Sequence, residues 1–81
     1  MKDLLQSLIE KLVDNPKDVS IEEITNNSEI TKYRITVNPS DVGKVIGKKG
    51  KNLGALRTIF QAIGAKESKG KKRIIIESDD F

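Results

Sequence analysis

The sequence of 81 residues predicts an α+β domain built from one mixed three-stranded sheet with three helices on one of its faces. Apolar residues recur at helical spacing near the amino terminus and again after residue 50, whereas three other segments are rich in β-branched residues. Two helical segments separate the second of these strands from the third, which allows a parallel crossover between them. The expected order is therefore helix, strand, strand, helix, helix, strand.

The amino-terminal segment predicts an amphipathic helix over residues 3–14. Its apolar stripe consists of Leu4, Leu5, Leu8, Ile9, Leu12 and Val13. Asp3 is available as the N-cap, and Asn15-Pro16 is expected to end the helix. Such a stripe is typical of a face that packs into a core, because too few basic residues line it for a membrane-surface helix.

Two strands are expected next, joined as an antiparallel hairpin. Residues 18–25 contain β-branched residues whose spacing does not alternate cleanly, which allows a bulge. The polar tract 26–29 is predicted to form the turn, and residues 31–37 alternate Tyr33 and Ile35 with polar residues. The second strand should therefore be half-buried with one polar face.

A pair of helices is expected to begin at residue 38. Asn38 can cap the first of them, Pro39 suits its first position, and Asp41 stands where the acid of a capping box lies. This helix should end near Ile46, and a third helix should follow a glycine turn and end at Gly64. The third helix is expected to bury a face made of Leu53, Leu56, Ile59, Phe60 and Ile63.

The last part of the sequence predicts a basic loop over residues 65–72 and a closing strand over residues 73–77. Three consecutive isoleucines in this strand suggest burial on both faces. The sequence has no internal repeat and no linker composition. We therefore expect a single domain over residues 1–81, with its core within residues 18–78.

Composition disfavours an enzyme. The chain has no cysteine and no histidine, which removes the thiolate nucleophile, disulfide bonds and the commonest general base and metal ligand. No catalytic residue, cofactor or metal site is therefore predicted. No apolar run approaches the roughly 20 residues of a membrane span, and the acidic residues of the first helix are unlike a secretory signal. The expected location is the cytoplasm, without membrane association.

Positive charge is concentrated in the middle of the chain. Residues 32–73 carry twelve basic and two acidic side chains, whereas residues 1–31 carry three basic and seven acidic ones. Residues 74–81 carry three acidic side chains. This distribution is typical of a protein that binds a phosphate backbone, with a lysine-rich solvated surface as the alternative.

The segment VIGKKGKNLGALR, residues 45–57, combines glycines with lysines. Gly47 and Gly50 let the backbone pass close to a phosphate, and the helix after them presents free N–H groups to an anion. The positive charges at this turn are Lys44, Lys48, Lys49 and Lys51. A nucleotide-binding P-loop is excluded, because Gly43 lies one residue too close to Gly47 and a lysine takes the place of the magnesium-binding hydroxyl. We interpret the turn as a clamp for a phosphodiester backbone.

This segment resembles the signature Ile-Gly-x-x-Gly-x-x-Ile-x-x-Leu of the KH nucleic-acid-binding domain, with Ile46, Gly47, Gly50, Leu53 and Leu56 at its fixed positions. The expected order of elements is similar to the type II KH fold. The longer stretch NPSDVGKVIGKKGKNLGALRTIFQAI, the chain length and the amino-terminal helix resemble the small bacterial single-KH RNA-binding proteins of the KhpA family. Gly54 departs from the pattern, because a larger and often basic residue is expected there. This glycine either lets helices pack closely or weakens its helix.

The resemblance implies a groove for about four unpaired nucleotides, bounded by the two central helices, the glycine loop and the last strand. Residues 47–50 would hold the sugar-phosphate backbone. Val45, Ile46 and the strand around Ile75 are implied to face the bases, unless these apolar side chains belong to the core. Arg57 or Arg73 would contact base edges. Because the chain has only three aromatic residues, base recognition should be shallow.

The resemblance further implies a non-enzymatic protein that binds single-stranded RNA, as an RNA chaperone or a post-transcriptional regulator. It also implies a homodimer, or a complex with a larger KH-domain RNA-binding protein. The alternative is a protein-interaction adaptor in which the KH fold docks partners and affinity for nucleic acid is incidental. Four lysines in or beside the glycine loop favour the first interpretation.

Overall fold

The computed structural model describes residues 1–27, 29–70 and 72–81. Its elements follow the predicted order, so the α+β fold class is confirmed. The helices and strands are α1 (Lys2–Leu12), β1 (Ser20–Asn27), β2 (Ile30–Thr36), α2 (Val42–Ile46), α3 (Lys51–Ser68) and β3 (Arg73–Glu77). Short 3-10 turns lie at Pro16–Asp18, Pro39–Asp41 and Lys48–Gly50.

The three strands form one mixed sheet in the order β1-β2-β3. β1 is antiparallel to β2, whereas β2 is parallel to β3, with Tyr33 opposite Ile76. The register of the hairpin shifts after Thr25, in agreement with the irregularity expected for the first strand. Residues 26–27 of the predicted turn belong to β1, and Ser28 lies outside the described residues.

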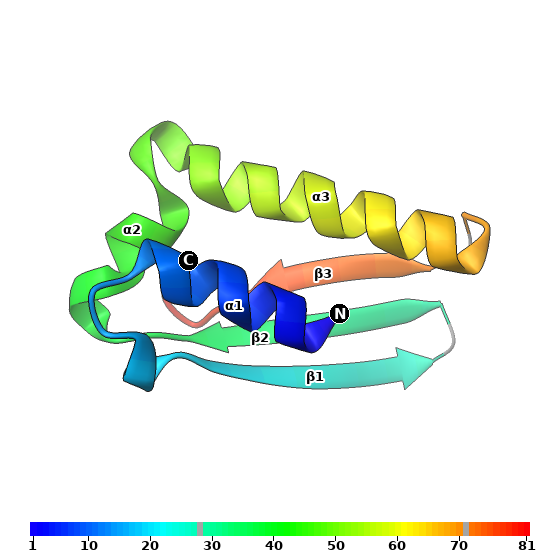
Figure 1. Cartoon of the computed structure of the whole chain (residues 1–81). Helices are drawn as coiled ribbons and strands as arrows, with labels where there is room; N and C mark the ends of the chain where they lie inside the picture. The colour runs from blue at the N-terminus through cyan, green and yellow to red at the C-terminus, as the bar shows by residue number, and fades with distance from the viewer. Residues whose placement is uncertain (28, 71) are drawn as a thin grey trace.

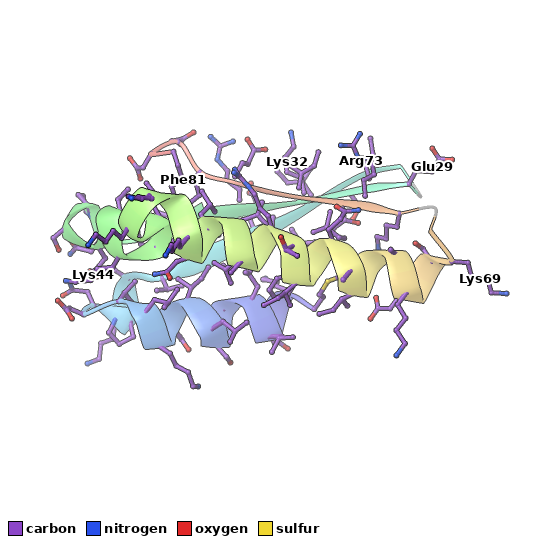
Figure 2. All side chains as sticks on the ribbon, turned by 90° about the horizontal axis from the view of Figure 1, so that it is seen from above. Glu29, Lys32, Lys44, Lys69, Arg73 and Phe81 are labelled. Carbon is purple, nitrogen blue, oxygen red and sulfur yellow. The ribbon has the colours of Figure 1, made fainter. Side chains whose placement is uncertain are left out.

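All three helices lie on the same face of the sheet, as predicted (Figure 1). α3 runs along β3 in the opposite direction, and α1 lies beside it over the rest of the sheet (Figures 1 and 2). The core between the two layers includes Leu5, Ile9, Tyr33, Ile35, Val45, Leu53, Leu56, Phe60, Ile74 and Ile76. Within residues 1–27, 29–70 and 72–81, no helix has the length and apolar character needed to cross a bilayer.

The predicted helix caps are only partly correct. Asn38 does cap the turn that leads into α2, since its side-chain oxygen accepts a hydrogen bond from the N–H of Ser40 at 2.9 Å. Asp3 lies in the first turn of α1 and does not cap it, because Met1 holds the N-cap position. The capping-box role predicted for Asp41 is wrong, since its carboxylate is buried and bonds to the segment after α1.

The third helix is longer than predicted. α3 continues past Gly64 to Ser68, and Lys69 ends it in the left-handed conformation with a φ of +57°. Residues 65–68 of the predicted basic loop are therefore helical, whereas Lys71 lies outside the described residues.

Gly64 has a packing role instead of a helix-ending one. A Cβ atom at this buried position would lie 2.6 Å from Cγ1 and 3.0 Å from Cδ1 of Ile74. Glycine therefore lets α3 approach β3 closely. A Cβ atom at Gly54, on the same helix, would meet no atom within 4 Å apart from its chain neighbours and the adjacent backbone of α3. Because no other element packs against this position, Gly54 does not serve close packing of helices. Of the two expected roles, this leaves the weakening of its own helix.

Two isoleucines predicted to be buried are exposed. Ile59 of α3 is 48% exposed, although Leu56 and Phe60 on the same helix belong to the core. Ile75 of β3 is 36% exposed, because helices cover only one face of the sheet and successive residues of a strand face opposite sides, so Ile75 faces away from the side on which Ile74 and Ile76 are buried. The three consecutive isoleucines therefore do not mark a strand buried on both faces.

We predict opposite effects of the same substitution at the two glycines of α3. Gly54→Ala should raise the free energy of unfolding by about 1 kcal/mol, because alanine favours the helix and meets no neighbour. Gly64→Ala should lower it by roughly 1–3 kcal/mol, because the new methyl group overpacks against Ile74. Urea unfolding followed by circular dichroism measures both, and equal stabilisation by both substitutions would contradict the close approach of α3 to β3.

Candidate nucleic-acid interface

The glycine loop joins α2 to α3 through backbone conformations that most residues avoid. Gly47 has φ and ψ of +77° and 171°, and Gly50 has φ and ψ of +76° and 14°. A Cβ atom at Gly47 would also lie 2.6 Å from Cγ of Asn52. Glycine is therefore required at position 47 by both conformation and contact, and favoured at position 50 by conformation alone.

Asn52 holds the two sides of the loop together. Its side-chain amide donates a hydrogen bond to the C=O of Lys44, in α2, at 2.8 Å. The N–H of Gly47 donates to the C=O of Gly43 at 2.9 Å, and that of Gly50 to the C=O of Gly47 at 3.0 Å. Sequence reasoning did not single out Asn52, because no local pattern marks a residue that bonds back to the preceding helix.

Three lysines of the loop project into solvent at the amino end of α3. Lys48, Lys49 and Lys51 are exposed, and none of them forms an ion pair within the described part of the chain. α3 has no acidic residue in its first turn and no side-chain cap. Because cations are disfavoured at the positive end of a helix dipole, these lysines do not stabilise α3. An anion bound there would compensate their charge.

Lys44 differs from the other three lysines, because it is paired within the protein. Its ammonium group forms ion pairs with Asp14 and, at 3.7 Å, with Asp41. The pKa of Lys44 is raised, first by its hydrogen bond to Asp14. Lys44 thus connects α2 to the segment after α1, and two carboxylates share its charge.

Asp41 fixes the position of α2 against that same segment. Its carboxylate accepts hydrogen bonds from the N–H of Asp14 at 3.2 Å and from the N–H and side-chain amide of Asn15, each at 3.0 Å. Burial by itself raises the pKa of Asp41, but these hydrogen bonds and Lys44 together hold the pKa below its ordinary value. These bonds also explain why α1 ends at Leu12, two residues before the predicted end at residue 14.

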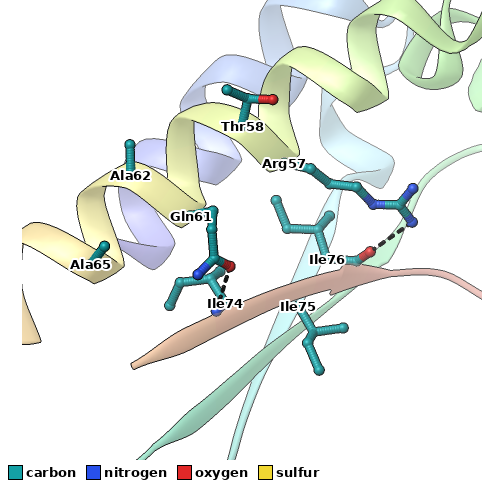
Figure 3. A pocket seen from close by; sticks show the side chains of 8 residues that line it. All are labelled: Arg57, Thr58, Gln61, Ala62, Ala65, Ile74, Ile75 and Ile76. Carbon is teal, nitrogen blue, oxygen red and sulfur yellow. Dashed lines mark hydrogen bonds between the residues drawn. The ribbon is translucent and has the colours of Figure 1, made fainter. Parts of the chain in front are cut away.

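An open groove of about 750 Å³ lies between α3 and β3 (Figure 3). It is lined by Arg57, Thr58, Gln61, Ala62, Ala65, Ile74, Ile75 and Ile76. Arg57 donates to the C=O of Ile76 at 3.1 Å, and the side-chain oxygen of Gln61 accepts from the N–H of Ile74 at 3.1 Å. The groove therefore combines small apolar side chains with a few oriented polar groups.

The predicted site residues do not all reach this groove. Val45 and Leu53 are buried in the core, and Ile46 is partly buried against it. Arg57 lines the groove, and its predicted contact with base edges stays a prediction. Arg73 points from the sheet away from the helices (Figure 2). Ile75 does line the groove, but its side chain points the same way as that of Arg73, because every second residue of a strand faces the same side of the sheet.

Several groove residues on α3 were not predicted. Thr58, Gln61, Ala62 and Ala65 line the groove together with Arg57. Spacings of three and four residues place them on one face of the helix. A helical projection starting from Arg57 would have found them.

The arrangement of the loop and the groove is suited to binding. The described residues contain no group of three or more His, Cys, Asp or Glu side chains that could hold a metal ion. The loop offers positive charge and close backbone approach, whereas the groove beside it offers an apolar surface with hydrogen-bonding groups. An extended chain with phosphates on one side and flat heterocycles on the other fits both parts.

Comparisons with known proteins agree with this chemistry. Residues 2–76 match the family model described as KhpA/KhpB, KH domain. The chain is 40% identical over 77 residues to the RNA-binding protein KhpA of Clostridium acetobutylicum, covering 95% of this chain and 97% of the relative. The corresponding protein of Listeria monocytogenes is 39% identical over 95% of this chain and 100% of its own length. The RNA-binding protein KhpA of Caldanaerobacter subterraneus is 42% identical over 95% of this chain and 97% of its own length. No solved structure gave a significant match.

Proposed function

Since the chain belongs to the KhpA/KhpB family of KH domains, we propose that it binds single-stranded RNA through the glycine loop and the groove between α3 and β3. The relatives are named for RNA binding and not for a reaction, in agreement with the expectation of a non-enzymatic protein. The proposed role is that of an RNA chaperone or post-transcriptional regulator in the cytoplasm.

The observation that carries this proposal is the unpaired charge of the glycine loop. Lys48, Lys49 and Lys51 gather at the amino end of α3, where none of the acidic side chains that the structure describes forms an ion pair with them. Phosphate groups of the RNA backbone would lie against residues 47–51, held by the lysines and by backbone N–H groups. The binding energy then comes mainly from charge, so affinity should depend strongly on salt.

The groove accounts for the preference for unpaired RNA. Its surface beside Ala62, Ala65 and the edge of β3 accepts flat bases only when they have left a duplex stack. A groove of this kind holds about four nucleotides. None of the described residues that line the groove is aromatic, so stacking contributes little and affinity at a single site should be modest.

A second surface supports self-association. Leu8, Leu12, Asn52, Ala55, Leu56 and Ile59 line an apolar groove of about 170 Å³ between α1 and α3. Leu4 and Ile59 are 47% and 48% exposed. We propose that a second copy of the chain covers this face, each copy presenting the same residues to the other. A larger KH-domain RNA-binding protein, the other partner implied by the resemblance, would use the same face.

Self-association would give the protein useful affinity without new contacts to RNA. Two linked grooves bind one RNA more tightly than either alone, because the second binding event is intramolecular. In the alternative, the protein is an adaptor that docks partner proteins on this apolar face and does not need RNA. It leaves the uncompensated lysines of the loop unexplained, and for that reason we favour RNA binding.

Reversing the loop charge should strongly weaken RNA binding without unfolding the protein. In the Lys48→Asp/Lys49→Asp variant, carboxylates would repel phosphates at the amino end of α3, and affinity for an unstructured RNA should fall roughly tenfold or more. Both side chains are exposed, and carboxylates suit the amino end of α3 better than ammonium groups, so the free energy of unfolding should not fall. Filter binding measures the affinity for RNA, and thermal melting measures the stability of the protein.

The matched control is Lys2→Asp/Lys17→Asp, which makes the same charge change at exposed positions away from the loop. It should lose little affinity, because exposed charges separated by more than about 10 Å are largely screened at ordinary salt. Equal losses in both variants would mean that net charge alone, and not the loop, binds RNA.

Ile59→Lys should separate self-association from single-site binding. Placing a charge in the apolar face should keep the protein monomeric in sedimentation at micromolar concentrations, whereas the unmodified chain should sediment faster as concentration rises. Affinity for a long RNA should fall, and affinity for a six-nucleotide RNA should not. An unmodified chain that stays monomeric yet binds long RNA tightly would contradict the proposed dimer.

A further inference from the structure

The groove between α3 and β3 extends toward the carboxyl end of α3, away from the glycine loop. β3 is an edge strand of the sheet, and its open edge faces α3 along the groove (Figure 3). On the helix, the lining side chains extend from Arg57 to Ala65, whereas α3 itself has 18 residues, Lys51–Ser68. At a rise of 1.5 Å per residue, the two ends of α3 lie about 27 Å apart. An RNA strand that follows the groove from the loop therefore approaches the far end of the helix.

That end of α3 carries a second group of positive charges. Lys66, Lys69 and Lys72 lie there, and none of them forms an ion pair within residues 1–27, 29–70 and 72–81. Lys66 and Lys69 are exposed. Figure 2 shows Lys69 beyond one end of α3 and Lys44 near the other. Because the carboxyl end of a helix dipole favours cations, stabilisation of α3 is the simplest role for these lysines.

Spacing along the helix places this charge beside the groove. Lys66 follows Ala62 by four residues, and Lys69 follows Ala65 by four, and both alanines line the groove. The only acidic residue of α3, Glu67, comes two residues after Ala65 and so projects from the opposite side of the helix. The groove therefore ends at lysines that no acidic side chain of α3 faces.

The backbone at Lys69 shows that helix stability alone does not favour lysine there. Lys69 ends α3 in the left-handed conformation, for which glycine is the usual residue. The turn is fixed, because the hydroxyl of Ser68 donates to the C=O of Gly64 at 2.6 Å and accepts from the N–H of Lys72 at 2.7 Å. Among the described residues, the only other non-glycine residue with a positive φ is Lys49 of the glycine loop. A lysine thus occupies a conformation better suited to glycine at each end of α3.

We propose that Lys66 and Lys69 form a second phosphate-binding site for the same RNA strand. The glycine loop would hold phosphates at one end of α3, the groove would take the bases, and these two lysines would hold phosphates at the other end. At the 3.4 Å spacing of phosphates in a stacked strand, about eight nucleotides are enough to join the two ends. This inference rests on the proposed function, because it requires RNA to enter the groove from the loop.

Removing the charge of the second site should weaken binding only for RNA that is long enough to reach it. In Lys66→Gln/Lys69→Gly, affinity for an unstructured 12-nucleotide RNA should fall roughly three- to tenfold, and affinity for a tetranucleotide should not change. The dependence of log affinity on log salt should become shallower by about 1.4 for the longer RNA, because two phosphate contacts are lost. Fluorescence anisotropy measures both affinities. All variants carry Ile59→Lys, so that two copies do not share one RNA.

Two control variants separate position from charge. Lys2→Gln/Lys11→Gln removes the same charge from exposed positions of α1 and should keep the ratio of the two affinities. Lys66→Arg/Lys69→Arg keeps the charge at the second site and should keep the affinity for the longer RNA. Circular dichroism checks folding, and Lys69→Gly alone, in which glycine suits the left-handed backbone, should change the ratio in the same direction.

An unchanged affinity of Lys66→Gln/Lys69→Gly for the 12-nucleotide RNA would mean that these lysines only stabilise α3. Equal losses for both RNAs would mean that the two lysines act through net charge. Either result would overturn this inference while leaving RNA binding at the loop intact. Failure of the parent chain to bind either RNA would overturn the proposed function, and this inference with it.

Discussion

The parallel pairing of β2 with β3 is the constraint on which the rest of the structure depends. Parallel neighbours cannot be joined by a tight turn and need a crossover, which here consists of α2, the glycine loop and α3. α3 then returns along β3, close enough to form one groove with it because Gly64 has no side chain to meet Ile74. The crossover that completes the sheet therefore also supplies both parts of the candidate interface.

The glycine loop contains features that work against local stability. Lys49 adopts the left-handed conformation with a φ of +57°, which costs a non-glycine residue roughly 1–2 kcal/mol. Lysines also surround the positive end of α3. Asn52 on one side and Asp41 on the other fix the surrounding backbone, so the loop keeps this conformation. These features do not stabilise the fold, but they are suited to binding an anion at the loop.

Features that depend on neighbouring residues could be predicted from the sequence, whereas features that depend on contacts between distant segments could not. Asn38 and the glycines determine conformation within a few residues, so the elements around the loop were predicted. Asp41 was misinterpreted because its partner Asn15 lies 26 positions away. Gly64 looked like a helix end because its contact with Ile74 is visible only in three dimensions. Gln61 was missed for the same reason, since its role depends on where β3 lies beside α3.

The proposed function requires that RNA meets the protein at the glycine loop and along the open edge of β3. A nuclear magnetic resonance titration of the labelled chain with an unstructured hexanucleotide tests it directly, because each backbone amide reports on its own surroundings. We expect the largest chemical-shift changes for residues 47–51 and for Ile74 and Ile76. Changes confined to the opposite face of the sheet, around Lys32 and Arg73, with the loop amides unmoved, would contradict it.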